Sequence, residues 1–233
     1  VIASNQTICS GGDPIPFAIT TQEIGMGALT YQWQSSIDGI TWVDVLSATS
    51  ATYDPPVTTT TIYYRRIVTS TLNGITCSAI SNSVIITVNN ITANSVLGNQ
   101  TVCSLGDPNA FTISIAANGS GTLTYQWQSS TTSPTAGFSD ILTLGNSSTY
   151  DPPSGISTTT YYQLIATSTL NGVVCSSISN ILTVTVNNVT APTIIDNQTL
   201  CSGGDPNEIV FSNSAAGTGV ISFQWQSSTT SIS

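Results

Sequence analysis

The chain lacks histidine and lysine altogether, and Arg65 and Arg66 are its only cationic side chains. Charged residues make up 6% of its 233 residues, and the excess of acids gives a formal net charge of −9. A nucleic-acid-binding surface needs clustered cations to neutralise phosphates, and a polybasic contact with anionic lipids needs them too. We therefore expect no nucleic-acid partner and no electrostatic attachment to membranes.

The missing residue types also restrict chemistry. Without histidine there is no histidine-based catalytic triad, and without lysine there is neither Schiff-base chemistry nor a Lys–Asn isopeptide cross-link. We predict that the protein is not an enzyme and needs no cofactor. A structural zinc site is not expected, because there is no Cys-x-x-Cys pair. Weak candidates for calcium are Asp13, Asp107 and Asp205, although each precedes a proline, where a turn is the simpler explanation.

Long hydrophobic runs are absent as well. No window reaches 18 consecutive apolar residues, so no membrane-spanning helix is expected. No signal peptide is visible at the start, and the last residues fall in the middle of a repeat. We expect an internal fragment of a larger secreted protein, with the export signal and the anchor elsewhere in the parent.

What the chain does have is an internal repeat. The block NQTICSGGDP at 5–14 returns as NQTVCSLGDP at 99–108 and as NQTLCSGGDP at 197–206. A second block, YQWQSS at 31–36, returns at 125–130 and, as FQWQSS, at 223–228. The blocks predict three units joined by short links: repeat 1 at 1–91, repeat 2 at 92–190 and a truncated repeat 3 at 191–233. Such short links, without Gly/Ser runs, favour a semi-rigid array.

Each repeat carries the signals of β-strands. Apolar and polar residues alternate over 29–34, and 62–69 and 84–88 are rich in β-branched residues. Asn-Gly pairs at 73–74 and 171–172 predict tight hairpins. About seven short strands around one tryptophan predict an all-β fold of tandem immunoglobulin-like sandwiches, in an extended array. The expected core tryptophans are Trp33, Trp127 and Trp225.

Five cysteines suggest a disulfide framework and an oxidising compartment. We expect Cys9 to pair with Cys77 and Cys103 with Cys175, each bridge joining the first strand of a repeat to its last hairpin near one end of the sandwich. Cys201 would find its partner beyond the fragment. Buried free thiols are the alternative.

One aromatic residue stands apart from the predicted cores. Trp42 lies in a segment that varies between repeats, where the second repeat has Phe138 nearby. It is a candidate contact residue for a ligand such as a surface glycan. If it is one, the chain could be a carbohydrate-binding or spacer module of a secreted hydrolase.

The combined motifs resemble those of bacterial Ig-like/PKD-like repeats in giant surface proteins of the Bacteroidetes, including gliding-motility adhesins and other type 9 secretion cargo. The matching segments are Cys9–Pro14, Tyr31–Ser36, Thr59–Tyr64, Leu72–Ser78 and Ser81–Asn82, which recur at Cys103–Pro108, Tyr125–Ser130, Thr158–Tyr162, Leu170–Ser176 and Ser179–Asn180.

The resemblance implies an exported stalk or filament at the cell surface, with no catalytic residues. Its partners would be neighbouring repeats of the same chain, copies of itself in a fibre, and surface glycans or other cells. An exposed edge strand would offer a route to lateral association.

Overall fold

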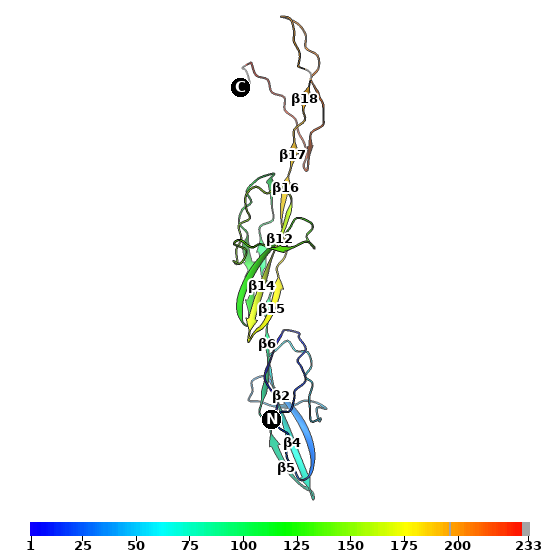
Figure 1. Ribbon diagram of the computed structural model, residues 1–233, viewed down its shortest axis with the longest axis vertical. Coiled ribbons are helices and arrows are strands. Elements are labelled where there is room, and N and C mark those ends of the chain that lie inside the picture. The colour runs from blue at the N-terminus through cyan, green and yellow to red at the C-terminus, as the bar shows by residue number, and fades with distance from the viewer. Residues whose placement is uncertain (196, 230–233) are drawn as a thin grey trace.

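The computed structural model describes residues 1–195 and 197–229, which form an elongated all-β array without a helix in those residues. Figure 1 shows the three repeats following one another along the long axis. The immunoglobulin-like fold predicted from the alternating pattern is confirmed: each of the first two repeats is built around one large, mainly antiparallel sheet.

Repeat 1 holds six strands in one sheet. They are β1 (Gln6–Cys9), β2 (Ala28–Ser36), β3 (Val43–Asp44), β4 (Ile62–Leu72), β5 (Ile75–Ile80) and β6 (Val84–Asn89). The order is β1-β6-β4-β2-β3, and β5 pairs with β4 beside the β4–β6 ladder. β1 runs parallel to β6, and this pairing brings Cys9 opposite Asn89 at one end of the repeat.

Repeat 2 repeats this sheet with β9 (Gln100–Cys103), β12 (Thr122–Ser130), β13 (Ser139–Asp140), β14 (Thr160–Leu170), β15 (Val173–Ile178) and β16 (Leu182–Asn187). Short strands join it to repeat 1 and begin its second layer: β7 (Ile91–Thr92), β8 (Ser95–Leu97), β10 (Thr112–Ile115) and β11 (Asn118–Gly119). β10 pairs with β8, and β11 pairs with β7.

The second layer of each sandwich is less regular than the first. In repeat 1 it is tied by isolated bridges such as Phe17 to Tyr53, and repeat 2 has the equivalent bridge from Phe111 to Tyr150. These rings pack on the tryptophan of the opposite sheet, with Phe17 stacked 5.7 Å from Trp33 and Phe111 5.4 Å from Trp127. Aromatic pairs at this spacing add to the stabilisation from apolar burial.

The cores of the two repeats are separate clusters. One contains Trp33, Tyr64 and Ile86, and the other contains Trp127, Tyr162 and Val184. Trp33 and Trp127 have no exposed surface, as the alternation predicts. Burial also raises the pKa of Tyr64 and of Tyr162 to about 12. Because each cluster contains residues of one repeat only, each repeat has its own hydrophobic core.

The end of repeat 2 and the described part of repeat 3 form two small ladders. β17 (Val189–Thr190) pairs with β20 (Ala216–Gly217), and β18 (Ile194–Ile195) pairs with β19 (Val210–Phe211). Trp225 is 53% exposed, so the expectation of a buried tryptophan is wrong for this repeat. Its ring stacks on Phe211 instead, at 5.4 Å between centroids, because the described residues of repeat 3 form no large sheet against which it could pack.

Candidate functional site: the junction between repeats

The contact between repeats 1 and 2 joins two different ends. We call the end of a repeat where its first and last strands finish the inserting end; in repeat 1 it holds Cys9 and Asn89. We call the end formed by the Asn-Gly hairpin the receiving end; in repeat 2 it is the β14–β15 hairpin with Cys175. In the chain, the inserting end of repeat 1 meets the receiving end of repeat 2, since β1 and β6 both contact β15.

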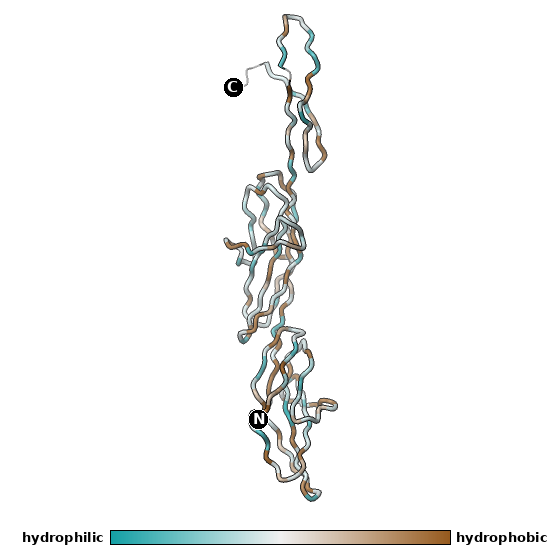
Figure 2. Tube along the Cα trace, turned by 45° about the vertical axis from the view of Figure 1, so that its right-hand side comes forward, coloured by the Kyte–Doolittle hydropathy of each residue, from teal (hydrophilic) through white to brown (hydrophobic). Residues whose placement is uncertain are grey.

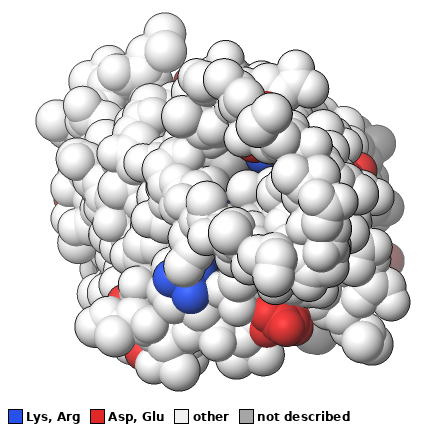
Figure 3. All heavy atoms as spheres, turned by 90° about the horizontal axis from the view of Figure 1, so that it is seen from below, with Lys and Arg blue, Asp and Glu red and all other residues white. Residues whose placement is uncertain are grey.

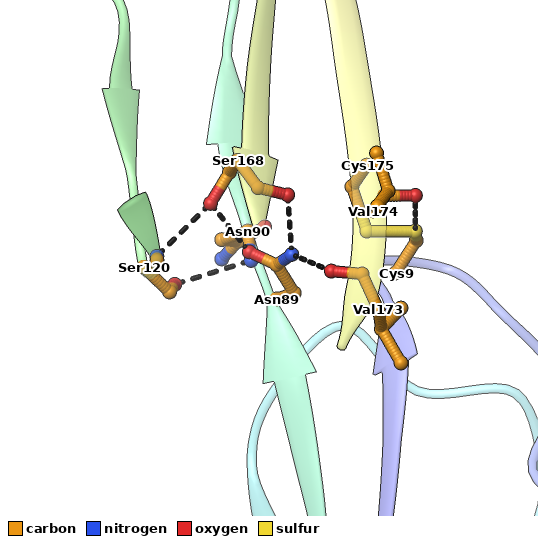
Figure 4. The surroundings of a disulfide bond; sticks show 9 residues. Cys9, Asn89, Asn90, Ser120, Ser168, Val173, Val174 and Cys175 are labelled. Atoms are coloured by element: carbon orange, nitrogen blue, oxygen red, sulfur yellow. Dashed lines mark hydrogen bonds between the residues drawn. A yellow bond between two sulfur atoms is a disulfide. The ribbon is translucent and has the colours of Figure 1, made fainter. Parts of the chain in front are cut away.

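A disulfide bond crosses this junction and links Cys9 to Cys175, with their Cα atoms 5.7 Å apart (Figure 4). The expected pairs, Cys9 with Cys77 and Cys103 with Cys175, are therefore wrong. The bond closes a sequence separation of 166 residues and ties one repeat to the next, whereas the prediction placed one bridge inside each repeat.

Strand geometry explains the correction. Cys77 is paired with Ser70, near the hairpin end of β4. At the other end of β4, Ile62 is paired with Ile86 of β6. Cys9 is paired with Asn89, which lies three residues further along β6 and away from the hairpin. The two cysteines are thus separated by eleven residues of strand, or about 35 Å at the usual rise. Disulfide-bonded Cα atoms lie within about 7 Å of each other, so Cys9 and Cys77 cannot be bridged within one repeat.

Asn89 forms the buried centre of the junction and is only 1% exposed. Its amide nitrogen donates to the carbonyl oxygen of Ser168 at 2.8 Å and to that of Val173 at 3.0 Å. The Ser168 hydroxyl donates to the Asn89 side-chain oxygen at 2.7 Å. Figure 4 shows this side chain reaching between β14 and β15 of the next repeat. A buried amide with all its groups paired fixes orientation, since any shift would leave polar groups unsatisfied.

Two more contacts surround this centre. The Asn90 backbone nitrogen donates to the Ser120 hydroxyl at 3.1 Å, and the Ser120 nitrogen donates to the Asn90 carbonyl at 2.9 Å. On the other side, the Asn171 side chain at the hairpin tip donates to the Thr7 hydroxyl at 3.1 Å. The hairpin itself is the predicted tight turn, with positive φ at Asn171 and at Gly172.

The remaining cysteines, Cys77, Cys103 and Cys201, are exposed and free in the part of the chain that the structure describes. Cys77 occupies the same place in repeat 1 as Cys175 in repeat 2, and Cys103 occupies the place of Cys9. The alternative of buried free thiols is therefore wrong for these three.

The other predicted site residues lie apart from the junction. Trp42 is half-buried, and the Arg65 guanidinium covers one face of its ring at 4.2 Å from the centroid. Asp13, Asp107 and Asp205 are exposed, and no group of three metal-ligating side chains occurs among residues 1–195 and 197–229. Over those same residues, no helix has the length and apolar character needed to cross a membrane.

The ion pair of the buried Arg66 and the partly buried Glu23 was not anticipated from the sequence. Arg66 Nη2 lies 2.6 Å from Glu23 Oε2, and Arg66 also stacks over the Tyr31 ring at 4.7 Å. Burial acts to raise the pKa of Glu23, but hydrogen bonds from Tyr31 and its own backbone, together with the Arg66 charge, lower it overall. Repeat 2 has Leu164 and Ala117 at these positions, so the pair is a feature of repeat 1 alone.

Residues 1–90 and 92–188 each match one family model, described as Domain of unknown function (DUF8696). The chain belongs to this family. Its DUF8696 domains carry both halves of the junction, because Cys9 and Asn89 lie in the first match and Cys175 lies in the second. No curated protein sequence matches the chain.

Solved structures with similarity to the chain include the N-terminal four Ig domains of Dscam1 isoform 7.44, at 14% identity and a TM-score of 0.37 over 78% of this chain and 43% of that one. The three N-terminal domains of the bacteriophage RB49 outer capsid protein Hoc match at 12% identity and a TM-score of 0.41, over 79% of this chain and 67% of that one. The amphioxus IgVJ-C2 molecule matches at 13% identity and a TM-score of 0.31, over 77% of this chain and 99% of that one. The chain spans less than half of the Dscam1 fragment.

Proposed function

We propose that this chain is a length of structural stalk in a secreted bacterial cell-surface adhesin or extracellular filament, with no catalytic role. Each repeat acts as a bead that sets distance from the cell, and the junction acts as a rigid joint. The three units at 1–91, 92–190 and 191–233 are the beads, and neighbouring repeats are their first partners. The motif resemblance to Bacteroidetes surface adhesins supports the finer assignment to gliding-motility-type cargo of type 9 secretion.

The observation that carries this proposal is the locked junction. A covalent bond between Cys9 and Cys175 and the buried amide of Asn89 hold two separate cores end to end. Ligand-binding sites between domains need an open cleft, whereas this contact is filled by its own side chains. A joint of this kind transmits orientation from one repeat to the next, as a stalk requires.

The surface supports an extracellular role. Seen along the axis from the receiving end of repeat 1, the molecule is almost entirely uncharged, with a few acidic and basic groups (Figure 3). Hydroxyl and amide side chains in place of charges make few non-specific ionic contacts. A disulfide bond persists in oxidising compartments, which agrees with export to the cell surface.

The test is a comparison of the oxidised chain with the C9S/C175S double variant, using spin labels placed in repeats 1 and 2. We expect a single narrow inter-repeat distance in the oxidised chain and a broader one in the variant, because only the hydrogen bonds would then hold the joint. C77S is the matched control and should leave the distance unchanged. A broad distribution in the oxidised chain itself would contradict a rigid stalk.

The alternative of a carbohydrate-binding module depends on Trp42. Aromatic sugar platforms present a free ring face, and here Arg65 covers one face and also donates to Gln34 at 2.8 Å. A glycan array with the chain and its W42A variant tests this directly. Strong binding that is lost in W42A would favour the module over the stalk.

A further inference from the structure

The hairpin ends of the two complete repeats are built alike but differ in what covers them. In β15 of repeat 2, Cys175 is buried at 6% exposure, and the neighbouring Ser168 of β14 is fully buried. In repeat 1, all six residues of β5 are exposed, including Cys77, and Ser70 is half-buried. The receiving end of repeat 2 is covered by the inserting end of repeat 1, while that of repeat 1 is open.

The open end keeps the polar arrangement that receives an asparagine. The Gly27 nitrogen donates to the Ser70 hydroxyl at 3.3 Å, as the Gly121 nitrogen donates to the Ser168 hydroxyl at 2.9 Å. In repeat 2 this arrangement leaves the Ser168 proton free to donate to Asn89. A cavity of about 180 Å³ lies beside Ser70 and Cys77, with Glu23, Leu29 and Val68 in its lining.

Apolar side chains surround this cavity. The lowest loops of repeat 1 carry hydrophobic stretches (Figure 2), and four large side chains there are 48–100% exposed: Ile24, Met26, Leu72 and Ile75. Val173, the counterpart of Ile75 in repeat 2, is half-buried within the junction. Clustered exposed apolar residues on an otherwise polar surface mark contact sites.

The complementary end is also present: its Cys103 is free, and its Asn187 side-chain oxygen accepts a hydrogen bond only from the Thr218 hydroxyl, at 2.9 Å, among the described contacts. At the inserting end of repeat 2, Cys103 is paired in register with Asn187, as Cys9 is with Asn89. Asn187 is exposed, whereas Asn89 is buried. The next residue already makes the junction pattern: the Asn188 nitrogen donates to the Thr218 hydroxyl at 3.0 Å, and the Thr218 nitrogen donates to the Asn188 carbonyl at 3.0 Å.

We propose that the open receiving end of repeat 1 is a docking site for the inserting end of another repeat of this kind. A cysteine at the position of Cys103 bonds to Cys77, and an asparagine at the position of Asn187 enters the cavity beside Ser70. The same bond, repeated along an array, would join every repeat to the next by staggered bridges. The proposal rests on the stalk function, but its test can fail while the joint between repeats 1 and 2 remains rigid.

The chemistry is thiol–disulfide exchange with a small-molecule disulfide as the oxidant. One thiolate attacks the oxidant and forms a mixed disulfide, releasing one equivalent of small thiol. The second thiolate then attacks the protein sulfur of this mixed disulfide, and the other small thiol leaves. Overall, two protein thiols are oxidised to one disulfide, while one oxidant molecule is reduced to two thiols.

The experiment uses the full chain as receiver and a single repeat, residues 95–192, as the inserting probe. This repeat contains all members of one core cluster, so it has its own core. When the repeats are aligned, Ser95 corresponds to Val1, and Pro192 corresponds to Asn94, the residue that directly precedes Ser95. The last residue of a docked probe would therefore lie just before Val1 of the chain and would not overlap it. A C175S change in the probe prevents it from joining to itself head to tail.

The probe and the chain are mixed in a glutathione redox buffer, and the adducts are mapped by mass spectrometry of non-reduced peptides. We expect the adduct of probe Cys103 with chain Cys77 to exceed adducts at chain Cys103 or Cys201 at least tenfold. The N187A probe, which loses the buried amide contacts, should form about tenfold less of it, since the groups around Ser70 would then be buried without a partner.

The C77S chain is the control and should give none of this adduct. Equal labelling of Cys77, Cys103 and Cys201 would show mere thiol exposure and would overturn the proposal. An N187A probe as effective as the parent probe would overturn the asparagine contact. In both cases the spin-label distance between repeats 1 and 2 reports separately whether the stalk geometry holds.

Discussion

At the scale of single residues, one strained position distinguishes the repeats. Leu105 has φ +64°, a left-handed conformation that costs a branched or bulky residue about 1 kcal/mol or more. Repeats 1 and 3 have glycine at this position, Gly11 and Gly203, with φ of 76° and 81°. The Leu105 side chain is 72% exposed, so little packing offsets the strain.

We predict that Leu105→Gly stabilises repeat 2 by about 0.5–1 kcal/mol, because the relief of strain exceeds the entropy that glycine adds to the unfolded chain. Urea unfolding measures the change. Leu105→Ala is the control, since it removes the exposed side chain and keeps the strain. A gain in the alanine variant equal to that in the glycine variant would contradict the explanation.

Asn89 and Asn94 are both buried near the junction but differ in their hydrogen bonds. Asn89 pairs with Ser168 and Val173, whereas neither polar atom of the Asn94 side chain has a partner among the described residues. We predict that Asn89→Ala destabilises the two-repeat unit by about 2 kcal/mol, because it leaves buried groups on repeat 2 unpaired. Asn94→Ala should be neutral or stabilising, and calorimetry of both variants provides the comparison.

At the scale of elements, the partly buried ion pair of repeat 1 has an apolar counterpart in repeat 2. Glu23→Ala leaves the Arg66 charge buried alone and should destabilise repeat 1 by about 3 kcal/mol. Replacing both residues by the repeat 2 pair, R66L with E23A, should restore stability to the parent level or above. A double variant as unstable as E23A, measured by urea unfolding, would show that the strands of repeat 1 need the charges.

The same pair predicts an acid dependence. The pKa of Glu23 is lowered in the folded chain, so its contribution to stability is present above the unfolded value near 4.5 and is lost as pH falls through the folded value. Unfolding free energy measured from pH 6 down to pH 3 should therefore fall less in R66L/E23A than in the parent. If the unfolding free energy of both proteins fell equally with pH, other carboxylates would account for the loss of stability in acid.

Strands and turns followed from the sequence, whereas the cysteine pairing did not. Alternation around Trp33 and the Asn-Gly pairs are local signals, and both define elements that the structure contains. The pairing depends on strand direction, since β1 and β9 lie parallel to β6 and β16 and carry their cysteines to the end opposite the hairpin. Asn89 lies two residues before the predicted end of repeat 1 at residue 91, but its burial depends on the neighbouring repeat.

At the scale of the whole molecule, the proposed stalk depends on a joint that uses residues of two repeats. The link between them is short, as the sequence indicates, yet shortness alone would still permit bending. Cys9, Asn89 and their partners on β14 and β15 remove that freedom. Arrays built in this way can extend by adding repeats without any change in the joint.

The bridge also determines how the chain would bear a pulling force. Tension applied at the two termini passes from Cys9 directly to Cys175, so residues 10–174, including Trp33 and Trp127, lie outside the loaded path. Ile2 of one core and Val184 of the other lie on the loaded segments. In single-molecule stretching we expect reduction to release roughly 550–600 Å of additional contour length, the reach of 166 residues. Under oxidising conditions residues 10–174 would not extend, and the load would act on β1 and β16, which lie on the loaded segments and would detach before the covalent bridge broke.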